Sequence, residues 1–446
     1  MTSPFPRTLR QSLQDNLHQL QSQLQHTNLD ALARQTRFQQ RSARKAPMLQ
    51  LVLALVALAA ETALSLERVA AVISLAIGTS YSKQAFHQRL GLPLERFLAE
   101  VAASLLHQLS LPTQNQGWFK SFRRVLLHDS TVEPLPRHLA SAFAGPANGR
   151  PGRYAALKLQ FVCDLLHSQV LHVSLSGFTR NDQAASPDIL HLLQPGDLII
   201  RDLGYFVLKV FQQISLRGAF FLSRYRHDVL IFDAQSGQPL DLAKLLRPGQ
   251  VWDRQVLLGK EKVPVRLVAQ PVSQALADRR RRQAKSNRDR RLNPGKRKLY
   301  LLGWNIFVTN VPSSIWPAKA LQPIYRLRWR IEIIFKAWKS HLGLRQLNCR
   351  TADLLGLSVM TKLLFCIAVY RLCDAIEWMG AAPRHVSLLR LARILGQCAC
   401  WFAAALLGLS TARWLEWHLR HHLFYEIRKD RQNFYELLSQ QPLRLT

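Results

Sequence analysis

Acidic residues are scarce in this chain of 446 residues. It has 28 Asp and Glu against 60 Lys and Arg, which gives a formal net charge of +32 at pH 7 and an isoelectric point of about 10.9. A chain this cationic repels itself unless it meets a polyanion, so the composition favours nucleic acid over a membrane surface or an acidic protein as partner. A carboxylate in a phosphate-binding groove opposes binding, and metal coordination is the usual reason for its presence.

Cysteine is also sparse, and its spacing excludes a common class of metal site. The chain has no CxxC pair, which argues against a structural zinc site. Most of the cysteines lie in apolar stretches and are expected to be buried free thiols in a reducing cytoplasm. The six are Cys163, Cys349, Cys366, Cys373, Cys398 and Cys400.

Targeting signals and long hydrophobic runs are lacking too. The first 45 residues contain no signal-peptide hydrophobic region. The apolar run Met48 to Ala60 is too short to span a bilayer. The run Ile394 to Ala412 is long enough, but its Gln, Cys, Ser and Thr side chains favour a buried helix over a membrane span. We therefore expect a cytoplasmic protein, and a bacterial host.

The N-terminal part is predicted to be helical. Five leucines recur at helical spacing and predict an amphipathic helix within residues 1–46: Leu9, Leu13, Leu17, Leu20 and Leu24. A basic helical segment follows, with Arg34, Arg37, Arg41, Arg44 and Lys45. This segment is either a solvated helix face or an element that recognises DNA ends, and the sequence favours neither. Residues 47–110 are predicted to form further helices.

Strand patterns begin near residue 124. Arg124 to Thr131 (RVLLHDST) is a short apolar run ending in polar residues, as expected of a buried strand. Leu157 to Leu165 and Val170 to Ser176 follow as a predicted hairpin. A helix is predicted over Ser186 to Leu193, and another buried strand over Asp197 to Arg201.

Residues 207–322 are predicted to form mostly short strands. These are Ala219 to Ser223, Val229 to Phe232, Val251 to Leu258, Val263 to Val268 and Tyr300 to Val308. Between the last two lies segment 279–298, with eleven Lys or Arg and a single acid, Asp289. We interpret this segment as a mobile arm or loop that contacts backbone phosphates, with a merely solvated surface as the alternative.

One long helix is predicted over Ile324 to Leu344, and it carries a polar stripe. Four residues at offsets 0, 3, 7 and 14 share a narrow face at about 100° per residue: Tyr325, Arg328, Glu332 and Lys339. Three of them are donors suited to phosphate oxygens. Neighbours that add stacking or charge are Trp329, Arg330 and Lys336. The alternative is an exposed helix stabilised by ion pairs between residues four apart.

Two more carboxylates are predicted at strand ends. Asp129 ends the strand at 124–131, and Asp202 follows the strand at 197–201. With Glu332 from a helix packed across them, they could converge, and crowding would raise their pKa values. Divalent cations remove that penalty: two Mg²⁺ about 3.5–4 Å apart can activate a water or a 3′-hydroxyl and stabilise the leaving oxygen of a phosphodiester. Taken singly, either Asp would be a strand-end cap or turn former.

These residues together resemble a known family. The four-residue spacing is similar to the Tyr-Arg-Glu-Lys signature of bacterial insertion-sequence transposases, in the branch called insertion sequence four. HDST at His128 to Thr131 resembles the block around the family's first Asp, and RDLGYF at Arg201 to Phe206 the block around its second. The resemblance covers about 120–345, whereas the helical regions on either side are only generally similar.

The resemblance implies roles residue by residue. The DDE triad, which would also hold Mg²⁺ (or Mn²⁺ as a substitute), would be Asp129, Asp202 and Glu332. The residues that contact DNA would be Tyr325, Arg328, Lys339, Trp329 and Lys336. Of these, the signature residues would grip phosphates of the transposon end, and Trp329 would pack against the end DNA. The partners would be double-stranded DNA, as transposon ends and target, and a second copy of the chain on paired ends.

The resemblance also implies the architecture. We expect an α/β protein with a ribonuclease-H-like mixed-sheet catalytic core, interrupted by a β-rich insertion and flanked by all-helical N- and C-terminal regions. The expected parts are a helical DNA-binding region (1–118), the first part of the core (119–206), the insertion with its basic arm (207–322), the completion of the core with the signature helix (323–375) and a helical region that could serve dimerisation (376–446).

The implied activity is cut-and-paste excision and strand transfer of an insertion sequence through a hairpin intermediate. In relatives, a Trp of the insertion captures a flipped base; Trp252 and Trp304 are the candidates here, although Trp304 could simply be a buried strand residue. The alternatives are a related metal-dependent nuclease and a non-catalytic DNA-binding regulator derived from a decayed element. The complete polar stripe argues against the first, and the presence of all three acids argues against the second.

Overall fold

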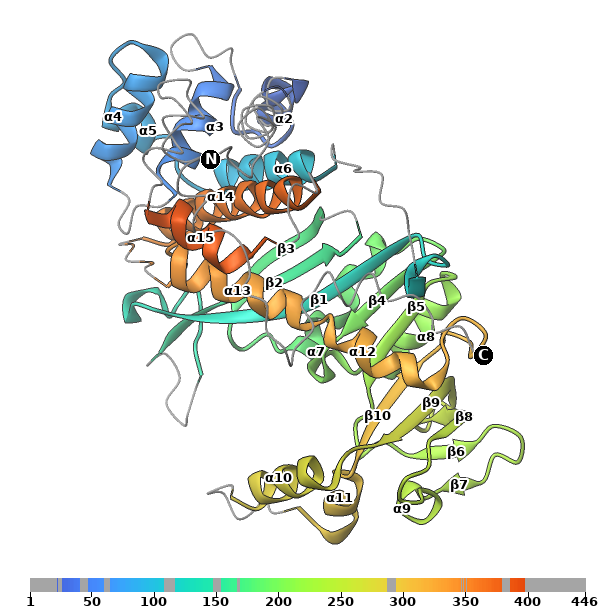
Figure 1. Ribbon diagram of the computed structural model, residues 1–446. Coiled ribbons are helices and arrows are strands. Elements are labelled where there is room, and N and C mark those ends of the chain that lie inside the picture. The colour runs from blue at the N-terminus through green and yellow to red at the C-terminus, as the bar shows by residue number, and fades with distance from the viewer. Residues whose placement is uncertain are drawn as a thin grey trace, which may run out of the picture.

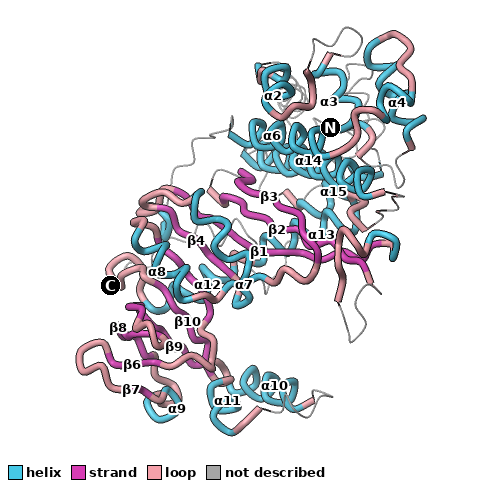
Figure 2. Tube along the Cα trace, turned by 180° about the vertical axis from the view of Figure 1, so that it is seen from behind, coloured by secondary structure: helices cyan, strands magenta, loops and turns pink. Residues whose placement is uncertain are grey.

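The protein is built around one ten-stranded mixed sheet, with helices on both faces (Figures 1 and 2). The computed structural model describes residues 22, 26–40, 47–59, 65–107, 117–146, 154–166, 169–286, 294–345, 347, 349, 351–378 and 386–397. The strand order across the sheet is β3-β2-β1-β4-β5-β10-β9-β8-β6-β7. The α/β class predicted from the sequence is confirmed.

The strands follow the apolar runs of the sequence. They are β1 (Arg124–Leu135), β2 (Ala155–Asp164), β3 (Gln169–Gly177), β4 (Asp197–Arg201), β5 (Phe220–Arg224), β6 (Ile231–Asp233), β7 (Pro239–Leu240), β8 (Trp252–Leu258), β9 (Val263–Pro271) and β10 (Trp304–Thr309). The hairpin of β2 and β3 is confirmed, and β1 pairs antiparallel with β2. In the middle of the sheet β1, β4 and β5 run parallel, whereas all pairs from β5 to β7 are antiparallel.

Helices cover the two faces of the sheet differently. Across one face run α12 (Leu321–Arg326) and α13 (Trp329–His341), drawn in orange in Figure 1. On the other face, nearer the viewer in Figure 2, lie α7 (Asp182–Ala185), the 3-10 helix η3 (Ser186–Leu192) and α8 (Leu208–Leu216). A helical cap beside β3 consists of α2 (Leu29–Gln35), α3 (Met48–Ala57), α4 (Leu66–Ile77), α5 (Lys83–His87), α6 (Leu92–His107), α14 (Ala352–Trp378) and α15 (Leu388–Gln397).

Strand side chains alternate between two hydrophobic cores. Leu127 of β1 and Ile200 of β4 join the core that contains α13, whereas Leu126 and Ile199 join the core that contains α8. This is the two-residue period of a pleated strand. Because both faces are covered, these strands are apolar at successive positions, which is why the sequence shows them as continuous apolar runs.

The segment between β5 and β10 forms the far end of the molecule. Arg224 at the end of β5 lies opposite Phe307 of β10, so the chain leaves and returns at neighbouring positions of the sheet. Besides strands, the segment contains α9 (Leu242–Leu245), α10 (Gln274–Lys285) and α11 (Lys296–Leu301). In Figure 1, α10 and α11 lie at the end opposite the helical cap. The sequence predicted neither α8 nor α10.

The prediction of a loop over 279–298 was wrong at both ends. Residues up to Lys285 belong to α10, and α11 begins at Lys296. Arg280 donates hydrogen bonds to Asn305 Oδ1 (2.7 Å) and to the carbonyl of Trp304 (3.3 Å). Arginine is a good helix former, and guanidinium groups that satisfy neighbouring carbonyls can pack instead of remaining solvated. Residues 287–293 lie outside the described residues. The predicted strand at 300–308 begins only at Trp304.

The prediction of one uninterrupted helix over 324–344 was also wrong. The chain forms α12 and α13 with a turn at Leu327 and Arg328 between them. There the amide of Arg328 bonds to the carbonyl of Tyr325 (3.2 Å), and the amide of Ile331 to that of Arg328 (3.1 Å). These i→i−3 bonds are those of a tight 3-10 turn, which changes the rotation from one residue to the next.

Several expectations concern residues outside the described ranges. The leucine-rich helix of residues 1–46 lies there, as do Arg41, Arg44 and Lys45 of the basic segment, and so does 398–446. Cys163, Cys349 and Cys366 are buried free thiols, as predicted. Over the residues that the structure describes, no helix is both long and apolar enough to cross a bilayer.

Candidate active site

Asp129 and Asp202 lie side by side at the point where β4 ends. The parallel register of β1 and β4 pairs His128 with Arg201, so the next pair along the chain is Asp129 and Asp202. Successive side chains point to opposite faces, and both carboxylates therefore point to the face covered by α13. The prediction that β1 ends at Asp129 was wrong, because β1 continues to Leu135. The strand that ends beside Asp129 is β4, which is parallel to β1.

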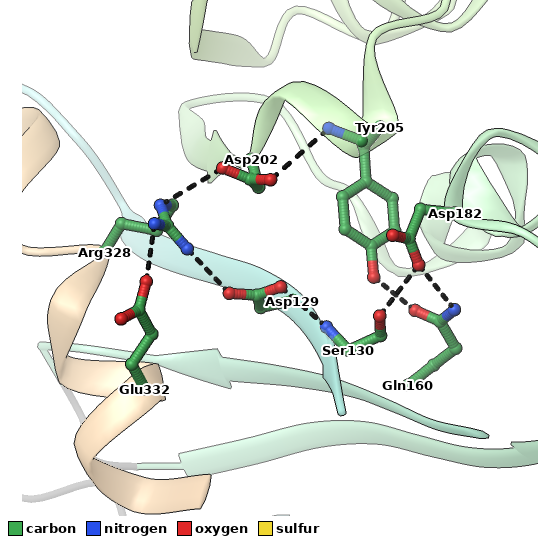
Figure 3. Close-up of polar contacts among 9 residues, drawn as sticks. Asp129, Ser130, Gln160, Asp182, Asp202, Tyr205, Arg328 and Glu332 are labelled. Carbon is green, nitrogen blue, oxygen red and sulfur yellow. Dashed lines mark hydrogen bonds and ion pairs between the residues drawn. The ribbon is translucent and has the colours of Figure 1, made fainter. Parts of the chain in front are cut away.

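Three carboxylates surround the guanidinium of Arg328 (Figure 3). Its Nη1 lies 2.7 Å from Asp129 Oδ2, and its Nη2 lies 2.6 Å from Glu332 Oε1. Its Nε lies 3.6 Å from Asp202 Oδ1. Two strands and the first turn of α13 thus bring together Asp129, Asp202 and Glu332, the three acids that the sequence singles out.

Burial and crowding make this centre favour positive charge. Asp129 has a side chain only 15% exposed. Its pKa is raised to about 6, mainly by burial and to a smaller extent by Asp202 and Glu332, while Arg328 and the amide of Ser130 work in the opposite direction. Although burial disfavours the charged form of Arg328, Tyr325 and the three carboxylates together raise its pKa above the usual value. The carboxylates thus form an acidic centre that is stabilised by a cation.

An open groove of about 440 Å³ extends from the carboxylates along one face of α13. Its lining consists of Asp129, Ser130, Thr131, Asp202, Arg328, Glu332, Phe335, Lys336, Lys339, Ser340 and Arg345. The acids lie on β1, at the end of β4 and in the first turn of α13, and the other cations follow along the helix and just beyond it. The groove therefore combines a cluster of negative charge with a row of positive charge. The row suits the phosphates of a nucleic-acid backbone, and the cluster would surround one reacting phosphate of that backbone.

The four other predicted DNA contacts differ in their surroundings. Lys336 is exposed, whereas the Nζ of Lys339 lies 2.5 Å from the buried Glu133 and bonds to the carbonyl of Val132 (2.9 Å). Tyr325 is half-buried, and its ring lies 5.9 Å from the Arg328 guanidinium. Trp329, which directly follows Arg328 in the chain, is 62% exposed. Lys336 and Trp329 are thus free to meet a ligand, whereas Lys339 is engaged with β1.

The two tryptophans of the insertion are not exposed in this way. Trp304 is 5% exposed, and its ring packs 4.8 Å from that of Tyr300. Trp252 is partly buried and packs against the same core. Trp304 is therefore the buried strand residue that the sequence offered as an alternative.

Behind the two aspartates, polar side chains fix the pairing of β1 and β4 from the opposite face. The Nη2 of Arg201 lies 3.0 Å from His128 Nδ1 and donates to the carbonyl of Ser186 (2.6 Å). Burial lowers the pKa of His128 well below its usual value and lowers that of Arg201 to about 9. The sequence analysis missed this cluster, although the polar residues directly before each Asp gave a signal for it.

A second network beside the acids was also missed. Asp182 Oδ1 accepts hydrogen bonds from Ser130 Oγ (2.8 Å) and Gln160 Nε2 (3.3 Å) and lies 2.7 Å from Lys158 Nζ. The hydroxyl of Tyr205 donates to Gln160 Oε1 (Figure 3). Lys158 and Gln160 gave the available signal, because polar side chains in a strand buried throughout need partners.

Asp129, Asp202 and Glu332 are the residues that could hold a divalent metal. Carboxylate oxygens are the ligands that Mg²⁺ prefers. Among the described residues, no three His, Cys, Asp or Glu side chains are grouped closely enough to hold one ion as they stand. In the carboxylate centre, the Arg328 guanidinium lies between the acids. The oxygen donors are of the kind that a divalent metal requires, and in this structure the guanidinium occupies the position between them.

Comparisons with known proteins place these residues within a known protein family. Residues 120–367 match the family described as "Transposase DDE domain". The chain is 31% identical, over 363 residues and 75% of each chain, to the transposase for insertion sequence element IS231D of Bacillus thuringiensis subsp. finitimus. It is 31% identical over 299 residues to that of IS231B of Bacillus thuringiensis subsp. berliner, and 24% identical over 306 residues to that of IS1151 of Clostridium perfringens.

The last two matches cover 62% and 64% of each chain, so this chain spans less than two thirds of those relatives. The family match, in contrast, covers more than half of the chain and contains every residue of the carboxylate centre. The prediction of a bacterial insertion-sequence transposase is confirmed. This chain belongs to the DDE transposase family of bacterial insertion sequences.

Proposed function

We propose that this chain cuts double-stranded DNA at the ends of an insertion sequence and joins the freed ends to target DNA, by a cut-and-paste route. One observation carries the proposal: Asp129, Asp202 and Glu332, from three separate elements, converge within ion-pairing distance of a single guanidinium. Three carboxylates this close together repel one another, which costs folding free energy. Such a cluster is typical of a site where a bound cation, during reaction at a phosphate, offsets that repulsion. The Tyr-Arg-Glu-Lys branch is part of this proposal.

The sheet supports a ribonuclease-H-like core. Its first half has the order β3-β2-β1-β4-β5, with an antiparallel meander followed by two parallel strands. We propose the parts 1–118, 119–206, 207–322, 323–375 and 376–446 as the functional divisions of the chain. Strand β5 lies within the part 207–322 but pairs parallel with β4 of the core. One continuous sheet therefore runs through both the core and the insertion.

We propose Mg²⁺, with Mn²⁺ as a substitute, as the cofactor of the carboxylate centre. Burial is the main cause of the raised pKa of Asp129, and the two neighbouring acids add to it even with Arg328 in place, so a further bound cation would stabilise the charged carboxylates. Bound divalent ions would activate the attacking oxygen and stabilise the leaving oxygen of a phosphodiester. The three carboxylates hold those ions, and Mg²⁺ suits few carboxylates together with phosphate oxygens.

Arg328 has a second partner in this proposal. A phosphodiester oxygen competes with the carboxylates for its guanidinium, since both accept charge-assisted hydrogen bonds. Lys336 and Tyr325 hold neighbouring phosphates of the transposon end, Lys339 does so in exchange for its contacts with Glu133 and Val132, and Trp329 offers its exposed ring to the end DNA. DNA binding thus draws Arg328 from the acids and frees their oxygens.

Four displacements at phosphorus make up the reaction. Water attacks the phosphodiester at the end of the element, and the bond to the 3′ oxygen breaks, which leaves a 3′-hydroxyl. That hydroxyl attacks the opposite strand and forms a hairpin as the flanking 3′ oxygen departs. Water reopens the hairpin and regenerates the 3′-hydroxyl, which finally attacks target DNA. In each step one P–O bond forms and one breaks, and the leaving oxygen takes up a proton as the nucleophile loses one.

The assembly and setting complete the proposal. Two copies would hold the paired ends, with residues 376–446 as a candidate contact region, and the protein would act on the DNA of a bacterial nucleoid. The basic helices α10 and α11 add exposed cations at the far end of the sheet. Counterion release from phosphates rewards such cations regardless of base sequence.

The test uses the purified protein and a duplex that carries the end of the element encoding it. We expect cleavage with Mg²⁺, leaving a 3′-hydroxyl, followed by joining to a second duplex. Both should vanish with EDTA and in Glu332→Gln, while binding of the duplex persists. Binding without cleavage under any divalent metal would identify a regulator from a decayed element. Cleavage without joining would identify a metal-dependent nuclease, and cleavage that survives Glu332→Gln would show that the third acid is misassigned.

A further inference from the structure

Asp182 is a fourth carboxylate beside the three acids, but it faces a different set of partners. It lies at the start of α7, on the side of Ser130 away from Arg328 (Figure 3). Its Oδ1 accepts a hydrogen bond from Ser130 Oγ (2.8 Å). Ser130 directly follows Asp129, and the backbone amide of Ser130 donates to Asp129 Oδ1 (2.8 Å). Asp182 is therefore one side chain removed from Asp129.

The same carboxylate also touches the loop that carries the second acid. A Cβ placed on Gly204 would lie only 2.9 Å from Asp182 Oδ2 and 3.3 Å from Asp182 Cβ. The amide of Gly204 points back to Asp202 Oδ2, at 3.4 Å. Asp182 thus packs against the backbone two residues after Asp202, so close that only glycine fits there without a shift.

Asp182 is already neutralised, which sets it apart from the metal-binding acids. Lys158 Nζ lies 2.7 Å from its Oδ1, and that lysine is 5% exposed in the buried strand β2. Gln160 Nε2 adds a third donor at 3.3 Å, and the Gln160 amide oxygen accepts from the hydroxyl of Tyr205, which belongs to the Asp202 loop. The charge of Asp182 is thus balanced by Lys158, and its Oδ1 is engaged with three donors. Such a carboxylate is suited to fixing the positions of the side chains that donate to it.

We propose that Asp182 is a positioning residue that fixes the separation and orientation of Asp129 and Asp202, by holding Ser130 on one side and the Gly204 backbone on the other. The inference rests on the proposed function, because it assigns Asp182 to the geometry of that metal-binding centre. Outer partners that orient the ligands of a metal typically change metal affinity or activity by about 10- to 100-fold when removed.

The experiment compares Asp182→Ala, Asp182→Asn and Ser130→Ala with the wild type, each bound to the end duplex. Mn²⁺ affinity is measured by electron paramagnetic resonance, and cleavage in single-turnover reactions. For Asp182→Ala we expect Mn²⁺ binding weakened about 10- to 100-fold and a similar loss of cleavage rate, with DNA affinity unchanged. Asp182→Asn retains an acceptor for Ser130 and should recover part of both. Ser130→Ala, which removes only one link, should lose less than Asp182→Ala.

Asp188 supplies a matched control six residues further along. It too is paired with a basic side chain, Arg180 (2.8 Å), but among the described residues its hydrogen bonds and ion pairs do not include Ser130 or Gly204. Asp188→Asn should leave Mn²⁺ affinity and cleavage unchanged. Gly204→Ala approaches the same contact from its other side: the added methyl displaces Asp182, and the variant should weaken Mn²⁺ binding as Asp182→Ala does.

A purely structural role predicts a different pattern. Asp182→Ala would then lower the melting temperature, yet its folded fraction would bind Mn²⁺ and cleave at wild-type rates, and that result would overturn the inference. Should Asp182→Ala fail to fold, Ser130→Ala and Gly204→Ala decide by the same two measurements. Cleavage by the wild type is scored first: if it cuts no DNA, the proposed function fails, whereas wild-type cleavage with unchanged variants refutes only the role of Asp182.

Discussion

Two regions of the ten-stranded sheet use charge in opposite ways. Near β1 and β4, three acids meet at one partly buried guanidinium. In the segment between β9 and β10, arginines are spread over α10, and the inner ones, such as Arg280, bond to neighbouring carbonyls while Arg279 and Arg282 remain exposed. The first arrangement concentrates charge at a point and the second distributes it over a surface.

The difference follows from what each arrangement can recognise. A point of converging acids can hold cations and act on one phosphate, and sub-ångström changes alter it because ligand geometry is strict. A dispersed cationic surface gains affinity from every phosphate it neutralises and tolerates imprecise placement. Substitutions in the acidic centre should therefore change the chemistry, whereas substitutions in the basic helices should change only binding. Four measurements test this division, in order of decreasing effect on cleavage.

The largest effect is expected from Asp202→Asn. Loss of one carboxylate from the centre should slow single-turnover cleavage by about a thousandfold or more, equivalent to ~4 kcal/mol of transition-state stabilisation. Asp233 at the end of β6 is partly exposed and lies far from the acids along the sheet order, so it provides the control, and Asp233→Asn should cleave normally. A variant Asp202→Asn that retained a tenth of wild-type cleavage would break the comparison.

Arg328→Ala should move two measurements in opposite directions. Removing the guanidinium takes away a competitor for the carboxylates, so Mn²⁺ affinity of the free protein should rise about tenfold. Cleavage should nevertheless fall about a hundredfold, because a positioned donor to the reacting phosphate is lost. Arg326, exposed two residues earlier, is the matched control, and Arg326→Ala should change neither. Lower Mn²⁺ affinity in Arg328→Ala would refute competition.

The raised pKa of Asp129 predicts a dependence on pH. Since its pKa rises from 3.8 to about 6 on folding, this group stabilises the metal-free fold fully below pH ~4 and loses that contribution, at most ~3 kcal/mol, as pH rises through 6. Chemical denaturation between pH 4 and 7.5 should show the decline in the wild type and a flatter curve in Asp129→Asn. Cleavage at low Mn²⁺ should show the reverse trend and fall up to tenfold per pH unit below 6, because protons compete with the metal.

The smallest effect on cleavage is expected from the basic helices. Replacing Arg279 and Arg282 by Gln should reduce the slope of log affinity against log salt by about 1.8, since each lost phosphate contact contributes ~0.9. Cleavage at saturating protein should not change. Gln substitutions of Lys209 and Arg217, two exposed cations of α8, control for net charge. An equal loss of slope in the control would mean that α10 has no special part in DNA binding.

The sequence predicted the region around the three acids better than the basic segment between β9 and β10. The run Asp197 to Arg201 coincides with β4, because a strand buried on both faces shows successive apolar residues, here Leu198 to Ile200. The positions of Asp129, Asp202 and Glu332 were predictable because strand and helix periods decide which side chains share a face. Pattern alone could not show the turn between α12 and α13, since it arises from local hydrogen bonds that sheet packing permits.

Partnerships between distant residues were out of reach for a different reason. Asp182 follows Asn181, whose side chain caps α7, so the sequence explains this acid as part of a helix start. Only the fold reveals Lys158 beside it, from a strand more than twenty residues earlier. The same holds for α10: a run of arginines is ordinarily solvated, and only the carbonyls just before and at the first residue of β10 give Arg280 hydrogen-bond partners in a packed position.

The cross-strand pairing of Arg224 with Phe307 has a consequence for how this molecule could diversify. Everything between these positions is an excursion whose two ends are held as neighbours in the sheet. Lengthening such an excursion costs little closure entropy, and no strand that carries an acid depends on its contents. The strands and basic helices of this excursion could therefore be replaced, enlarged or trimmed in related proteins. The positions of the three acids, and with them the phosphate chemistry, would stay the same.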